Sequence, residues 1–97
     1  EDLSRAIEKI VVKKQNLTPI NFSSGKATNI FQLVNLLTKI TKKNPKIKFI
    51  NKSLSSASYR VLDNSKFNRI FKGFNRTPLK KGLEETITWY VKNEKKK

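Results

Sequence analysis

Apolar residues recur three and four positions apart in two stretches of this sequence, and that spacing predicts amphipathic helices. In residues 2–13 they line one face after Asp2, a good N-cap residue: Leu3, Ala6, Ile7 and Ile10. In residues 29–43 the helix should begin at Asn29, which with Gln32 has the spacing of a capping box. Its apolar stripe is Ile30, Leu33, Val34, Leu37 and Ile40, widened by Phe31 and Leu36. So broad an apolar stripe indicates a helix that packs on a sheet or between layers.

Two short apolar stretches flank the second helix and predict strands. Residues 17–22 form the first, limited by Pro19, and residues 47–50 form the second, after the Asn-Pro pair at 44–45 ends the helix. Strand, helix and strand across residues 17–51 make a βαβ unit, whose strands should run parallel with a right-handed crossover. We therefore expect an α/β fold, with a small βαβ parallel-strand core and flanking helices.

The last part of the chain predicts two more helices. Residues 51–58 are polar and small, as in an exposed loop, and residues 59–62 are expected to be extended. A short helix should follow, with Asp63 as its N-cap and Gly73 in the left-handed position after its end. The final helix should begin at Pro78, whose fixed φ suits a first turn, and should bury one face together with its tryptophan: Leu79, Leu83, Ile87, Tyr90 and Trp89.

The chain is short and strongly basic. Its 97 residues have room for one small domain, expected at 1–93, before a basic tail at 94–97. The net charge of +15 gives affinity for polyanions, so a small basic nucleic-acid-binding module is the alternative function. The basic residues are mostly lysines scattered along the chain, whereas nucleic-acid readers favour the arginine fork, which argues against nucleic acid as a partner.

Several classes of protein are excluded by what the sequence lacks. It contains no Cys and no His, which removes disulfides, cysteine nucleophiles, Ser-His-Asp triads and the usual zinc sites. No apolar run is long enough to cross a bilayer and no signal-peptide core is present, so a cytoplasmic location is expected. The chain starts at Glu1 and enters a helix at once, which suggests an excised piece of a longer protein.

The turn at 23–26, Ser-Ser-Gly-Lys, resembles part of a phosphate-binding loop but does not match that motif. The first glycine of the motif would fall on Ile20, and Ala27 stands where Ser or Thr is needed. A tight turn before a helix is the better interpretation.

The order of short motifs resembles the C-terminal region of the extended short-chain dehydrogenases, the NAD(P)-dependent sugar-nucleotide epimerases, dehydratases and ketoreductases. The resemblance covers residues 2–90. Its motifs are Asp2-Leu3 with Ala6-Ile7, Ile20 to Gly25, Thr28-Asn29-Ile30 with Gln32-Leu33, Tyr59 to Asp63 with Ser65-Lys66, Gly73-Phe74, and Thr77-Pro78-Leu79 with Gly82-Leu83, Thr86 and Trp89-Tyr90.

The resemblance implies a substrate-binding domain that closes over a nucleotide diphosphate sugar. Members of this family hold NAD or NADP on an N-terminal Rossmann domain with a glycine-rich loop and a Tyr-x-x-x-Lys pair, and the intact parent could be a homodimer. Here Tyr59 and Tyr90 are followed four residues later by Asp63 and Glu94, and the chain has three glycines in all. This chain alone is therefore expected to bind no cofactor and to catalyse no hydride transfer.

The resemblance also indicates the candidate substrate contacts. Arg60 lies where family members often carry a basic contact residue, and its guanidinium suits a diphosphate. The competing interpretations are an exposed arginine beside a strand and an arginine paired with Asp63. Residues in and beside the preceding loop are the further candidates: Lys52, Ser55, Ser56 and Tyr59. The family's Arg-Pro-Gly-Asp segment is replaced by residues 52–56. A protein-interaction adaptor that uses an exposed apolar edge is a third possibility.

Overall fold

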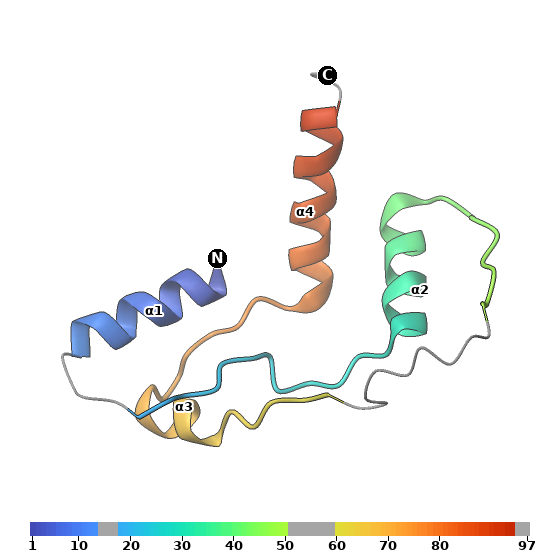
Figure 1. Cartoon of the computed structure of the whole chain (residues 1–97). Coiled ribbons are helices and arrows are strands. Elements are labelled where there is room, and N and C mark those ends of the chain that lie inside the picture. Colours follow the sequence, from blue (N-terminus) through green and yellow to red (C-terminus); the bar gives the residue numbers. More distant parts are fainter. Residues whose placement is uncertain (14–17, 51–59, 95–97) are drawn as a thin grey trace. The chain divides into compact units, whose positions relative to one another are not determined.

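The computed structural model describes residues 1–13, 18–50 and 60–94, and every regular element in this part of the chain is a helix (Figure 1). The helices are α1 (Asp2–Lys13), α2 (Ile30–Thr41), α3 (Ser65–Ile70) and α4 (Leu79–Glu94). They belong to two compact units. Unit 1 consists of Glu1–Ala27 and Tyr59–Arg76 and contains α1 and α3, and unit 2 consists of Thr28–Ser58 and Thr77–Lys97 and contains α2 and α4.

The expected α/β fold is wrong, because the described residues contain no strand and therefore no βαβ core. Residues 18–29 and 42–50 follow irregular paths on either side of α2. A strand needs a partner that pairs with its backbone groups, and Pro19 has no N–H to offer. In unit 1 the backbone around residues 18–23 is bound by side chains instead, and Phe49 and Ile50 in unit 2 are 76% and 75% exposed.

Helix α1 has the predicted bounds but buries less than its pattern suggested. Ala6 is buried, whereas Leu3 and Ile7 on the same predicted face are more than half exposed. Its first turn is held by an ion pair between Arg5 and Asp2 at 2.8 Å, and Arg5 also donates to the backbone oxygen of Asn75. Cation–π contacts hold both ends of the helix, because Arg5 lies 5.1 Å from the Phe74 ring centroid and Lys13 lies 5.6 Å from the Phe71 ring centroid.

The core of unit 1 is a cluster of phenylalanines around Phe67, which is fully buried. The rings of Phe22, Phe71 and Phe74 lie 4.8, 4.9 and 5.2 Å from the Phe67 ring between centroids. Such tilted and edge-to-face ring pairs are favourable beyond their buried area. This cluster connects residues that are far apart in the sequence and so defines the unit.

In unit 2 the prediction of the long helix α2 is confirmed. The Asn29 side chain accepts from the Gln32 N–H at 2.8 Å, and the Gln32 side chain accepts from the Asn29 N–H at 3.0 Å, which is the predicted capping box. The helix ends at Lys42, which adopts the left-handed conformation with a φ of 53°. Trp89 in α4 is 65% exposed, so its predicted place in a core is wrong.

Candidate functional site

Arg60 lies at the start of an exposed arm, residues 60–63, that leads to α3. It is the single predicted substrate contact within the described part of the chain. The other candidates lie outside the described residues: Lys52, Ser55, Ser56 and Tyr59. No hydrogen bond or ion pair joins the Arg60 guanidinium to another described residue, so Arg60 is not paired with Asp63, and an exposed Arg60 without a ligand is the competing interpretation that remains.

The carboxylate of Asp63 is bound instead to the start of α3. It accepts from the Ser65 hydroxyl and from the Ser65 backbone N–H, the latter at 2.8 Å. These two hydrogen bonds, the hydroxyl first, favour the charged form and lower the pKa of Asp63 below its ordinary value. The N-cap position is occupied by Asn64 rather than by Asp63, so the predicted cap is wrong by one residue.

Asn64 connects the arm to the turn at residues 23–25. It is 7% exposed, and its side chain pairs with Ser23 in both directions. The Ser23 N–H donates to Asn64 Oδ1 at 2.9 Å, and Asn64 Nδ2 donates to the Ser23 carbonyl at 2.8 Å. The Ser23 hydroxyl also donates to Asn64 Oδ1 at 3.0 Å. The Asn64 side chain thereby forms the two hydrogen bonds with the Ser23 backbone that a neighbouring strand would otherwise form.

Gly25 is required where this turn approaches Asn64. Its φ is +71°, which residues with a side chain rarely adopt, and a Cβ there would lie 2.8 Å from Asn64 Nδ2. The N–H groups of Gly25 and Lys26 donate to the hydroxyls of Ser23 and Ser24. These amides are therefore occupied, which agrees with the rejection of a phosphate-binding loop.

Arg76 secures the same turn from the other side. Its Nε donates to the Ser23 carbonyl at 2.6 Å and one terminal nitrogen donates to Asn68 Oδ1 at 3.0 Å. Its guanidinium carbon lies 5.1 to 5.7 Å from the ring centroids of three phenylalanines: Phe22, Phe67 and Phe74. Arg76 is thus engaged in structure, while Arg60 is placed where a ligand could reach it.

Neither Asn64 nor Arg76 stood out in the sequence. A single asparagine between Asp63 and Ser65 has the composition of an ordinary turn, and one arginine among many basic residues carries no periodic signal. The sequence feature that could have identified Arg76 is its place among phenylalanines in a chain whose cations are otherwise mostly lysines, because arginine stacks well on aromatic rings.

The described residues hold no cluster of side chains that could bind a metal ion. No group of three or more carboxylates gathers in them where a metal ion could be held. Within these same residues, no helix has the length and apolar character that a bilayer crossing demands. The arm itself carries one guanidinium, at Arg60, that can bind an anion, and one carboxylate, at Asp63, that is hydrogen-bonded to Ser65.

Comparison with curated proteins finds that the chain is distantly similar to a sugar-nucleotide epimerase/reductase. The relative is a probable GDP-L-fucose synthase 1 from Oryza sativa subsp. japonica, with 28% identity over 94 residues. The match covers 96% of this chain and 28% of the relative, so the chain spans about 28% of the length of the curated relative it matches. No family model matches the chain, and no solved structure matches it.

Proposed function

We propose that this chain forms the substrate-binding region of an NAD(P)-dependent sugar-nucleotide epimerase, dehydratase or ketoreductase, with Arg60 as a contact to the diphosphate. The observation that carries the proposal is the similarity to a probable GDP-L-fucose synthase over 96% of the chain. The motif order from Asp2 to Tyr90 agrees with it, because that order resembles the C-terminal region of the same class of enzyme.

The geometry around Arg60 is compatible with this role. The arm is held by Asn64 and Ser23 behind it, while Arg60 itself is exposed and joined to no other described residue. A guanidinium presents parallel N–H donors that match the oxygens of a phosphate, and such charge-assisted bonds are the stronger ones. In this proposal Lys52, Ser55, Ser56 and Tyr59 belong to the same contact region.

Under this proposal the chain binds the nucleotide sugar, and the hydride transfer takes place on residues outside it. Hydride transfer would need a nicotinamide cofactor held by a separate Rossmann domain with its own Tyr-x-x-x-Lys pair. This chain would close over the nucleotide and sugar from the opposite side.

A titration with GDP-L-fucose, followed by amide chemical shifts, tests the proposal. We expect shifts concentrated at residues 60–63, and we expect Arg60→Gln to weaken binding about tenfold, because one charge-assisted hydrogen-bonding group is lost. Arg69→Gln is the matched control, since Arg69 is exposed near the end of α3 and away from the arm. Equal affinity for both variants, or shifts that avoid the arm at millimolar ligand, would contradict the assignment of Arg60.

A further inference from the structure

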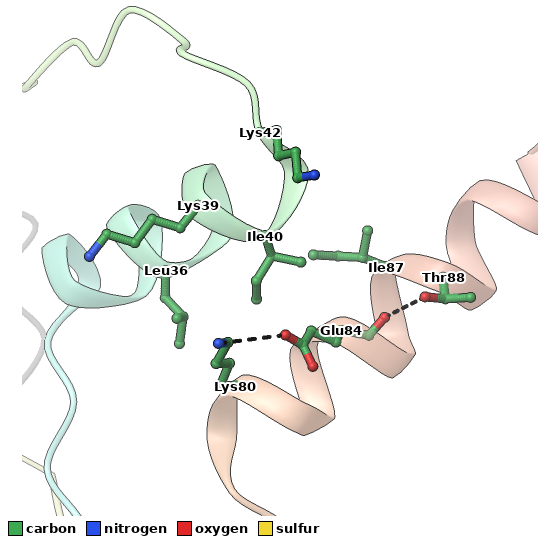
Figure 2. Close-up of a pocket in the computed structure, with 8 residues that line it drawn as sticks. All are labelled: Leu36, Lys39, Ile40, Lys42, Lys80, Glu84, Ile87 and Thr88. Carbon is green, nitrogen blue, oxygen red and sulfur yellow. Dashed lines mark hydrogen bonds and ion pairs between the residues drawn. The ribbon is translucent and has the colours of Figure 1, made fainter.

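A second surface lies on unit 2, in a hollow between α2 and α4 (Figure 2). Its volume is about 570 Å³ and its lining comes from both helices: Leu36, Lys39, Ile40 and Lys42 on one side, and Lys80, Glu84, Ile87 and Thr88 on the other. We propose that this hollow is a docking groove for an acidic, amphipathic helical segment of a partner protein. It lies in unit 2 whereas Arg60 belongs to unit 1, so this proposal stands without the substrate role.

The floor of the groove is apolar and extends along the helices. Leu36 and Ile40 are one turn apart on α2, and in Figure 2 Ile40 and Ile87 point toward each other. Val91, one turn beyond Ile87 on α4, is 46% exposed and continues the apolar strip. A strip of this kind matches the anchors that an amphipathic helix presents at positions i, i+4 and i+7.

The rim of the groove determines the charge of the occupant. Three lysines line the hollow and one carboxylate opposes them: Lys39, Lys42 and Lys80 against Glu84. Lys80 and Glu84 are 4.0 Å apart and their side chains are 69% and 49% exposed, so this pair is weak and open to exchange. The positive excess favours an acidic segment, whose carboxylates would face the lysines while its apolar side covers the floor.

The charge and polarity of the groove also favour this segment over a second copy of the chain and over a nucleic acid. A second copy of the chain carries a net charge of +15 and would meet like charge at the rim. A nucleic acid backbone would neutralise the lysines but would leave the apolar floor of Leu36, Ile40 and Ile87 uncovered.

The test uses a fluorescent peptide of about 14 residues, nearly four helical turns, with leucines at i, i+4 and i+7 and glutamates beside them. We expect anisotropy to report binding, with amide shifts at Leu36, Ile40 and Ile87. Lys42→Gln/Lys80→Gln should reduce affinity about fivefold, since two exposed charge pairs are lost. The double variant Lys43→Gln/Lys81→Gln removes the same charge outside the hollow and should leave affinity unchanged.

An apolar pair of variants separates this groove from a merely basic surface. Ile87→Ala should weaken binding of the peptide by at least about tenfold, because it removes most of an aliphatic side chain that the peptide would bury. Ile30→Ala is the control, since Ile30 is 73% exposed and is not part of the lining. Circular dichroism of each variant checks that helix content is retained.

The proposal is overturned by any of three results. The first is that a scrambled peptide of the same composition binds equally well. The second is that the control variants lose as much affinity as the groove variants. The third is that duplex RNA or phosphatidylserine vesicles displace the peptide and that their own binding does not change in Ile87→Ala. The last result would assign the surface to polyanions or to lipid.

Discussion

At the scale of single residues, the arm depends on one buried amide. Asn64 satisfies both backbone groups of Ser23, and its packing against Gly25 leaves no room for a Cβ there. Buried polar groups are costly when they lose a partner, because their desolvation is then uncompensated. The position of Arg60 is therefore tied to a side chain that does not itself contact the proposed ligand.

The replacement Asn64→Ala tests this dependence. We expect the free energy of unfolding to fall by about 1–3 kcal/mol, because the Ser23 N–H loses its acceptor in a part-buried place, while the Ser23 carbonyl keeps only its bond from Arg76 Nε. Chemical denaturation measures the change, and Asn21→Ala, on an exposed residue of the same stretch, is the control. Equal stability of the two variants would show that Asn64 does not hold the arm.

At the scale of elements, helices α3 and α2 are stabilised by different interactions. Helix α3 has six residues, too short to persist by itself, and depends on Phe67 packing among other aromatic rings. Helix α2 has no fully buried residue among those described, so its ends matter more. Its capping box satisfies backbone N–H groups at its start, and near its end the Thr41 hydroxyl donates to the carbonyls of Leu37 and Thr38.

The capping box of α2 provides a prediction at this scale. Asn29→Ala should destabilise the helix by about 1 kcal/mol, because the Gln32 N–H loses its acceptor. Gln32→Ala should cost less in the Asn29→Ala background than alone, since the two side chains cap reciprocally. Amide hydrogen exchange in the first turn of α2 measures both effects, and Asn44→Ala beyond the helix end is the control. Strictly additive changes would contradict a reciprocal cap.

At the scale of the whole molecule, the positive charge is divided between the two units. By sequence, unit 1 carries ten basic and four acidic residues, and unit 2 carries twelve and three. Neither unit concentrates the excess, and Arg76 in unit 1 is already engaged with backbone and aromatic rings. Both units therefore carry a positive net charge by sequence.

The salt dependence of duplex binding distinguishes contact with a few phosphates from binding along a nucleic-acid backbone. If about two phosphates are contacted, duplex affinity should fall about tenfold between about 50 mM and about 200 mM salt. A nucleic-acid-binding module with six or more phosphate contacts would lose about a thousandfold over the same range. Anisotropy titrations of a labelled duplex at several salt concentrations measure the slope. The steeper result would replace the sugar-nucleotide proposal with the alternative function.

Local patterns determined much of the secondary structure. The bounds of α1, the capping box of Asn29 and Gln32, and the left-handed Gly73 with its φ of 75° all depend on residues within a few positions of one another. The pairing of residues 17–22 with 47–50 was wrong, because strand pairing is a contact between distant segments. Apolar residues in a short run do not reveal whether such a partner is present.

The sequence indicated the bounds of α1 and the capping box that begins α2, the absence of cysteine and histidine chemistry, and the order of motifs that resembles the sugar-nucleotide enzymes. These follow from neighbouring residues and from composition. The tertiary structure alone decided that Asn64 and Arg76 meet at Ser23, that Phe67 is buried, and that Trp89 is exposed. The physical reason is that burial and buried hydrogen bonds join residues far apart in the chain, and no local periodicity encodes which of them meet.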